Sequence, residues 1–157
     1  MIEIRIARPA DAALVLQFIR ELADYEKLSD QVVATEAGIT ETLFGAHRAA
    51  EALIAELDGA PAGFAIFFPN YSTFLARPGI YLEDLFVKPA FRRQGVGRAL
   101  FTRVARLAVE RGCGRFEWSV LDWNAPAIAF YRSLGAVPLD DWTVFRLTGE
   151  ALSRAAR

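Results

Sequence analysis

The sequence predicts an α+β fold with α/β-type layers, in which helices cover a mostly antiparallel sheet. Segments with the apolar period of a strand alternate with segments of helical period, and a short Asp-Gly turn joins two of the strand segments. A long amphipathic helix between two apolar strands predicts one parallel strand pair at that crossover. The chain of 157 residues has no internal repeat or long linker, so we expect a single domain over residues 1–157.

The first third of the chain predicts one strand and two helices. Apolar and charged residues alternate over Met1–Ala7, as in a strand with one buried face. The segment Ala12–Lys27 places apolar residues at helical spacing, namely Leu14, Phe18, Leu22 and Tyr25. Thr35 has the side chain of a helix N-cap and predicts a short second helix that runs to Phe44.

The middle of the chain predicts a hairpin and a further strand. Ala52–Leu57 and Ala62–Phe68 are apolar segments that the turn at Asp58-Gly59 separates. Pro69–Gly79 is rich in turn-forming residues, which predicts a loop. The apolar segment Ile80–Val87 follows and predicts a buried strand.

The last third predicts two helices, two strands and a polar helical tail. Helical periodicity covers Gly97–Arg111, and a short apolar segment, Phe116–Leu121, predicts the next strand. Asn124 is a suitable N-cap for a helix that runs to Leu134. We expect Thr143–Leu147 to form the last strand of the sheet.

Composition narrows the classes of function. The formal net charge is −1, whereas a nucleic-acid-binding protein carries a basic excess, so we expect small neutral or cationic partners and no nucleic acid. Cys113 is the single cysteine, which excludes an internal disulfide and a multi-cysteine metal site, and no spacing of His, Asp and Glu suggests another metal site. The sequence has no signal peptide and no apolar run of about 18 residues, so we expect a cytoplasmic protein without a membrane partner.

Two adjacent carboxylates interrupt the apolar strand IYLEDLFV. Glu83 and Asp84 occupy its middle, and neighbouring side chains of a regular strand point to opposite faces. Burying an unpaired carboxylate costs several kcal/mol or forces it to take up a proton. A role beyond packing is therefore expected for at least one of the two acids.

The loop after this strand has the composition of an anion-binding site. Gly95 and Gly97 stand at the start of the long helix, where backbone NH groups and the helix dipole favour an anion. Arg92, Arg93 and Arg98 add fixed positive charge that suits phosphate oxygens. The segment is a candidate pyrophosphate site.

Two nucleotide-binding motifs fit this segment poorly. A P-loop requires Lys and then Ser or Thr after its second glycine, whereas Arg98 and Ala99 stand there. A Rossmann fingerprint requires a small residue where Leu100 stands, and glycines directly after the strand. Glycines that merely end a loop, with solvent-exposed arginines, are the alternative without function.

The segment Arg92–Gly97, RRQGVG, resembles the acetyl-CoA motif of the GNAT N-acetyltransferase superfamily. More narrowly, the chain is similar to the diamine (spermidine/spermine) N-acetyltransferase group. The similarity includes RELADYEKLSDQV, IYLEDLFVKPAFRRQGVG, DWNAPAIAFYRSLGA and DDWTVFRL, and so runs along nearly the whole chain. The resemblance implies a GNAT fold, with a central sheet of about six or seven strands flanked by about four helices.

The resemblance also implies how acetyl-CoA is bound. The pantetheine arm would pair with the backbone of the acidic strand, the pyrophosphate would lie on the NH groups of the glycine loop, and the helix after Asn124 would contact the cofactor. The expected acetyl-CoA contacts are Leu85, Phe86, Val87, Arg92, Arg93, Gln94, Gly95, Val96, Gly97, Arg98, Asn124, Pro126 and Tyr131. An NH near Leu85 could polarise the thioester carbonyl.

Catalytic and substrate residues follow from the same resemblance. Tyr131 matches the general acid, and a phenol with an ordinary pKa of about 10 is protonated at neutral pH; a packed aromatic is the alternative. Glu83 matches a residue beside the acceptor amine and is expected to relay the proton through water. Asp84 is expected to be a structural partner of an arginine, with a bulge or the substrate cleft as alternatives. Tyr25 and Glu26 match a substrate-contacting pair, although Glu26 is equally well explained as a solvated surface charge.

The expected reaction is the transfer of an acetyl group from acetyl-CoA to a primary amine of a small cationic substrate, such as a polyamine, diamine or lysine-like amine, in a ternary complex. The acceptor itself stays open, because Phe74 stands where the family has Trp and Arg77 adds positive charge near the entrance. Alternatives are a protein N-terminus, a lysine side chain or another amine as acceptor, or a non-catalytic acyl-CoA-binding module. The resemblance further implies a homodimer.

Overall fold

A computed structural model describes residues 1–157. Its backbone divides into two compact units, Met1–Ser119 and Val120–Arg157. The first unit contains the whole sheet and three helices, and the second contains two short helices. No helix is long and apolar enough to cross a membrane.

One mixed sheet of five strands forms the first unit, in the order β1-β2-β3-β4-β5. The strands are β1 Ile2–Ile6, β2 Glu51–Leu57, β3 Ala60–Ser72, β4 Arg77–Val87 and β5 Arg115–Trp118. The first four strands pair antiparallel, and β4 pairs with β5 in parallel, as expected for two strands joined by a helical crossover. The mostly antiparallel sheet is confirmed, but the expected count of six or seven strands is wrong.

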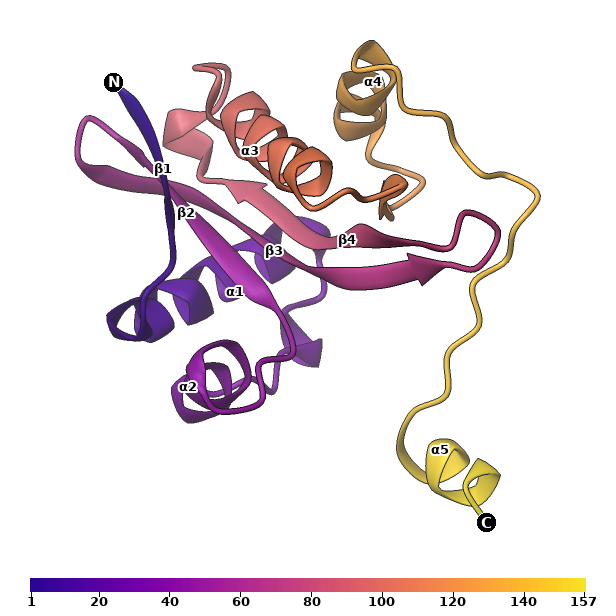
Figure 1. Ribbon diagram of the computed structural model, residues 1–157. Helices are drawn as coiled ribbons and strands as arrows, with labels where there is room; N and C mark the ends of the chain where they lie inside the picture. Colours follow the sequence, from indigo (N-terminus) through magenta and orange to yellow (C-terminus); the bar gives the residue numbers. More distant parts are fainter. The chain divides into compact units, whose positions relative to one another are not determined.

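Helices cover both faces of this sheet (Figure 1). The helices α1 Ala12–Glu26 and α2 Glu36–Phe44 lie on one face, and α3 Val96–Glu110 lies on the other. Helix α1 ends at Lys27, which is left-handed with φ 62°. Helix α2 begins after its N-cap Thr35, whose hydroxyl accepts a hydrogen bond from the NH of Gly38, 3.1 Å away.

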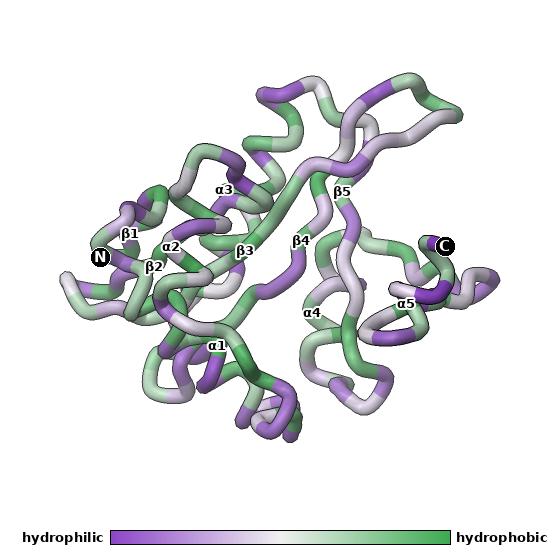
Figure 2. Tube along the Cα trace, turned by 90° about the horizontal axis from the view of Figure 1, so that it is seen from below, coloured by the Kyte–Doolittle hydropathy of each residue, from purple (hydrophilic) through white to green (hydrophobic).

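The hydrophobic core has two layers, one on each face of the sheet. On the α1 face, Phe18 stacks on Phe64 of β3 with ring centroids 5.2 Å apart. On the α3 face, Leu100 and Val104 are fully buried against the sheet. Figure 2 shows the hydrophobic colour concentrated along the central strands, which are covered on both sides.

A β-bulge interrupts the pairing of β3 with β4 beside the two acids. Ile66 lies opposite Asp84 and Phe67 lies opposite Leu82, so Glu83 has no partner across the ladder. A bulge inserts one extra residue and shifts the side-chain alternation of everything that follows it. The two acids therefore do not occupy the positions they would have in a regular strand.

Two local expectations in the first unit are wrong. The predicted loop Pro69–Gly79 is mostly strand, because β3 runs to Ser72 and β4 begins at Arg77, and the turn between them has Ala76 at φ 50°. The predicted strand Phe116–Leu121 ends early, at Trp118, because only Gly79–Leu82 of β4 pair with it. Turn-forming residues and apolar length did not indicate where ladder partners are available.

The second unit has α4 Ala125–Ser133 and α5 Gly149–Ala155. The Asn124 side chain accepts from the NH of Ala127 at 3.4 Å, which confirms the expected cap. The expected strand Thr143–Leu147 is irregular, because a strand requires a ladder partner and the unit has none. Its apolar side chains Val144 and Phe145 are 81% and 92% exposed.

Candidate active site

The start of α3 has the backbone conformation expected of an anion-binding site. Gly95 is its N-cap, with φ 87° and no side chain to accept from the first-turn NH groups. Arg93, two residues earlier, is also left-handed, with φ 60°. Left-handed residues in such a loop turn backbone NH groups toward one point, and the first-turn NH groups add the positive end of the helix dipole. This arrangement fits a pyrophosphate group.

Gly97 brings the first turn of α3 close to the end of β4. A Cβ atom at this position would lie 3.6 Å from Cγ2 of Val87 and 3.9 Å from Cδ2 of Leu85, which is ordinary contact. A larger side chain at this position would therefore crowd Val87 and Leu85. The first turn of α3 thus lies directly against the strand expected to pair with the pantetheine arm.

Arg92 connects this loop to α1 on the other face. Its Nε donates to the carbonyl of Val87 at 3.0 Å, and its guanidinium lies 4.7 Å from the ring centroid of Tyr25 and 5.8 Å from that of Phe86. These are cation–π distances. The side chain is therefore held against Tyr25, and the Arg92 phosphate contact stays a prediction.

A pocket of about 290 Å³ lies at this junction of α1, β4 and the loop. Its lining residues are Glu21, Asp24, Tyr25, Phe86, Pro89 and Arg92. Sequence reasoning missed the two α1 acids, Glu21 and Asp24. Glu21 lies four residues before Tyr25 and three before Asp24, and residues at these spacings are neighbours on a helix surface. Their helical spacing is the signal that could have revealed them.

Glu83 and Asp84 have different environments. Glu83 is exposed on the bulge, whereas Asp84 is half-buried. Burial, and then the negative charges of Glu83 and Glu26, raise the pKa of Asp84 to about 7. Burial also raises the pKa of Glu26. Three carboxylates thus interact at the end of α1 and the bulge of β4.

The expectation that Asp84 pairs with an arginine is wrong. None of the ion pairs of the chain involves Asp84, and only negative groups influence its charge. An arginine partner would have lowered the pKa of this carboxyl. Of the alternatives, the structure confirms the bulge.

The remaining expected site residues belong to the second unit. Tyr131 is half-buried in the last turns of α4, with its ring centroid 5.5 Å from that of Phe130. Asn124 caps the same helix, and Pro126 occupies its first turn. One short helix thus places all three at its two ends. Tyr25, Glu26, Glu83, Asp84 and the α3 loop are gathered in the first unit.

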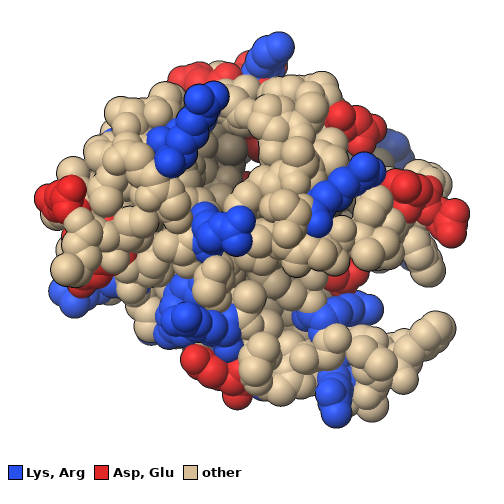
Figure 3. All heavy atoms as spheres, turned by 90° about the horizontal axis from the view of Figure 1, so that it is seen from above, with Lys and Arg blue, Asp and Glu red and all other residues tan.

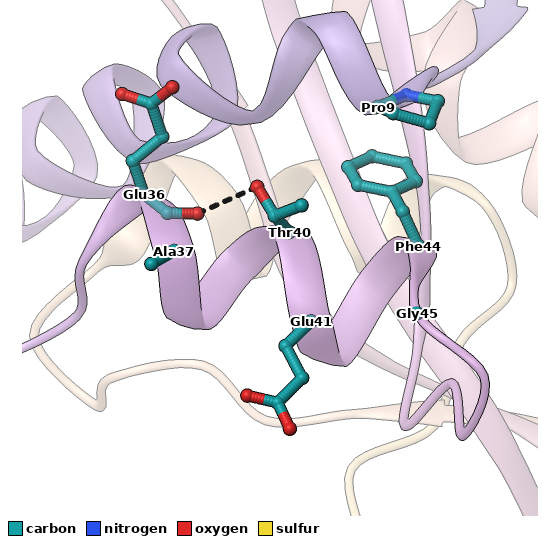
Figure 4. Close-up of a pocket in the computed structure, with 7 residues that line it drawn as sticks. All are labelled: Pro9, Glu36, Ala37, Thr40, Glu41, Phe44 and Gly45. Carbon is teal, nitrogen blue, oxygen red and sulfur yellow. Dashed lines mark hydrogen bonds between the residues drawn. The ribbon is translucent and has the colours of Figure 1, made fainter.

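A larger open pocket, of about 570 Å³, lies beside α2 (Figure 4). The ring of Phe44 faces Pro9, and the Thr40 hydroxyl donates to the carbonyl of Glu36 at 2.9 Å. The carboxylates of Glu36 and Glu41 are exposed and point away from each other. The only titratable residues that line this pocket are Glu36 and Glu41, and both are exposed, so the pocket is not a candidate active site.

Charge is distributed without one dominant sign. Figure 3 shows Lys and Arg side chains interspersed with Asp and Glu on the face drawn there, in keeping with the formal net charge of −1. No group of three His, Cys, Asp or Glu residues is arranged to hold a metal ion.

The fold, the glycine loop and the acidic strand define an acetyltransferase. The sequence profile of the Acetyltransferase (GNAT) family matches residues 17–136, and the chain belongs to this family, whose co-substrate is acetyl-CoA. Among its relatives, the thialysine N-epsilon-acetyltransferase of Sus scrofa is 41% identical over 98% of the chain and 96% of that protein. The human spermidine/spermine N(1)-acetyltransferase-like protein 1 is 30% identical over 96% of the chain and 23% of that protein. The predicted likeness to the diamine acetyltransferase group is thereby confirmed.

A solved structure has the same fold over nearly the full chain. The integron cassette protein from the mobile metagenome of V. cholerae superposes with a TM-score of 0.82 at 25% identity, covering 99% of this chain and 98% of that one. The expected GNAT fold is confirmed, with five strands in the sheet.

Proposed function

We propose that the protein transfers the acetyl group of acetyl-CoA to a primary amine of a small cationic substrate, such as a diamine, polyamine or lysine-like amine. The observation that carries the acceptor class is the group of three carboxylates, Glu26, Glu83 and Asp84, none of which is balanced by an ion pair with a positive side chain of the chain. A substrate ammonium would supply that positive charge. Two relatives are named for thialysine and for spermidine and spermine, which are aminoalkyl compounds.

The remaining site residues receive roles from chemistry and position. The backbone of Leu85, Phe86 and Val87 holds the pantetheine arm, and the NH groups of the loop from Arg92 to Arg98 hold the pyrophosphate. Within that loop Gln94 shapes the turn, since its side-chain amide donates to the carbonyl of Ala90 at 3.1 Å. Val96 is buried and anchors the first turn of α3.

The acetyl group passes directly to the amine in a ternary complex. Glu83, exposed at the bulge, attracts the ammonium and exchanges protons with water. Tyr25 supplies an aromatic wall for the alkyl chain, and Glu26 adds negative charge. Asn124 and Pro126 begin the helix that contacts the cofactor, and Tyr131 donates a proton to the departing thiolate.

We also propose a cytoplasmic homodimer that acts as a single domain over residues 1–157. The family profile spans the junction of the two units, which supports one domain. A partner subunit would cover the exposed apolar side chains Val144 and Phe145, which is the support for a dimer. The single free Cys113 suits a reducing compartment, and the balanced charge suits a small-molecule enzyme that binds neither nucleic acid nor membranes and requires no metal.

A thiol-release assay tests the proposal. Acetyl-CoA is mixed with the protein and a panel of diamines, polyamines, lysine analogues, aminoglycosides and peptides, and free thiol is measured. Release with short diamines or lysine analogues is the expected result. Release only with peptides would assign a protein acceptor, and acetyl-CoA binding without amine-dependent release would leave a non-catalytic binder.

A further inference from the structure

We propose that Asp84, rather than Glu83, is the group that directly accepts the proton of the acceptor ammonium. The proposal rests on the proposed function and deepens it, because it assigns the proton acceptor of the same site. Glu83 then has the separate role of attracting the cation at the bulge.

The bulge sets the face of the sheet on which the Asp84 side chain lies. Asp84 lies opposite Ile66, which belongs to the core cluster on the α1 face, whereas Leu82 lies opposite Phe67, whose ring is 5.9 Å from the Arg111 guanidinium at the end of α3. Residues two apart in a regular strand share a face. Because Glu83 is the extra residue, Asp84 is on the opposite face from Leu82.

The α1 face of β4 also carries Phe86, and with it one wall of a pocket. Phe86, two residues after Asp84, is in the same α1-face cluster and lines the pocket with Tyr25. Glu26 is next to Tyr25 and close enough to influence the charge of Asp84. The bulge therefore places Asp84 on the same face of β4 as Phe86 and its pocket, while Leu85 remains on the face of Gly97 and the loop before α3.

Asp84 lies next in the chain to the expected reaction centre at Leu85. One peptide bond joins Asp84 to Leu85, whose NH is the expected donor to the thioester carbonyl. An amine placed to attack that carbonyl from the α1 side would meet the Asp84 carboxylate first. Glu83, exposed on the bulge, would reach the same amine only through solvent.

The acetyl transfer requires that the ammonium first lose a proton. One ammonium N–H bond breaks and its proton forms an O–H bond on Asp84. The nitrogen lone pair then forms the C–N bond to the acetyl carbon and the C–S bond breaks. The new amide nitrogen releases its second proton to water, and the departing thiolate takes a proton from Tyr131, which solvent reprotonates. An amine titrates near pH 10, so transfer to a carboxylate of ordinary pKa near 4 is about a millionfold unfavourable. With the Asp84 pKa near 7, the transfer is about a thousandfold less unfavourable.

The groups that surround Asp84 predict how its titration responds to mutation. Glu83 on its own strand and Glu26 on α1 are the charged groups that influence it, and both are acidic. Removing either charge should move the Asp84 titration toward lower pH. Glu110, at the end of α3 and 3.5 Å from Arg103, offers a control acid that does not influence Asp84.

The test is the pH dependence of kcat/KM for amine-dependent thiol release by the full-length protein. For the wild type we expect a tenfold rise per pH unit up to about pH 7 and a level region above it. Asp84→Asn should lower kcat/KM at least 100-fold, and its residual rate should continue to rise toward pH 10, because only the free amine then reacts.

Matched variants separate proton acceptance from charge attraction. Glu26→Gln should move the break in the profile to lower pH, Glu110→Gln should leave it in place, and Glu83→Gln should raise KM while keeping a break. Acetyl-CoA binding by Asp84→Asn, measured by calorimetry, should equal that of the wild type, which shows that the site is folded.

Three results would overturn the proposal or its basis. If Asp84→Asn keeps the break and Glu83→Gln loses it, Glu83 is the proton acceptor. If the wild-type rate rises without a break to pH 10, neither acid accepts the proton. If the wild type releases no thiol with any amine, the proposed function fails, irrespective of Asp84.

Discussion

Asp84 should make the protein less stable at the pH at which it works. Its folded-state pKa of about 7 lies above the ordinary value of 3.8, so the folded protein binds this proton more tightly than the unfolded chain. The stabilisation that comes from protonating Asp84 is therefore fully present below about pH 4 and is lost as the pH rises through 7. At about 1.4 kcal/mol per pH unit, the full loss above pH 8 is about 4 kcal/mol.

The Asp84→Asn variant removes this charge while keeping the shape of the side chain. By the same linkage, ionisation of Asp84 lowers the free energy of unfolding of the wild type by about 2 kcal/mol at pH 5 and about 4 kcal/mol at pH 8, and the variant loses neither amount. The stability advantage of the variant over the wild type should therefore grow by about 2 to 3 kcal/mol across this range. Costs that both proteins share cancel in the difference.

Urea unfolding at several pH values measures this difference. Replacing Trp123 and Trp142 with Phe in both proteins leaves Trp118 of β5 as the fluorescent probe of the unit that contains Asp84. Glu110→Gln removes an exposed carboxylate and should show a constant offset across the same range. Parallel stability curves for wild type and Asp84→Asn would refute the reasoning, because they would mean that Asp84 titrates alike in the folded and unfolded states.

Three further predictions concern the cofactor and substrate sites. Tyr131→Phe should lower turnover by about one to several orders of magnitude with little change in acetyl-CoA affinity, and an unchanged turnover would remove Tyr131 from the mechanism. Gly97→Leu should abolish acetyl-CoA binding measured by calorimetry while circular dichroism still reports a folded chain; retained affinity would disprove the pyrophosphate assignment. Arg92→Gln removes the guanidinium over Tyr25 and should raise the amine KM several-fold, in line with the roughly 1 kcal/mol of an exposed cation–π contact. If Arg92→Gln raises KM by the same factor in a Tyr25→Leu background, the two side chains do not act together.

Elements with strong local signals could be predicted from the sequence. The helices α1, α2 and α3 begin and end within a residue or two of their expected bounds, because apolar spacing, Thr35 and the glycine-rich loop act locally. The strand at Thr143–Leu147 could not be predicted correctly, because its apolar alternation says nothing about an available partner strand. The same holds for the hairpin at Pro69–Gly79, where pairing overrides turn-forming residues.

The site shows the same division. The left-handed turn at the start of α3 could be predicted from Gly95, because glycine adopts positive φ without steric cost. The environment of Asp84 was not, because it depends on a register shift opposite Ile66 and on an α1 acid far away in the chain. Residue type alone therefore favoured an arginine partner that the fold does not supply.

The bulge also has a consequence for how the strand tolerates insertions and deletions. Glu83 is the one residue of β4 that the ladder with β3 skips, so a chain shortened by that residue would pair regularly from Leu82 to Asp84. Such a deletion would remove one acid and keep the other on its face, whereas a deletion farther along the strand would exchange the faces of the residues between that position and the bulge. A single-codon deletion could thus separate the attraction of the cation from the chemistry on it.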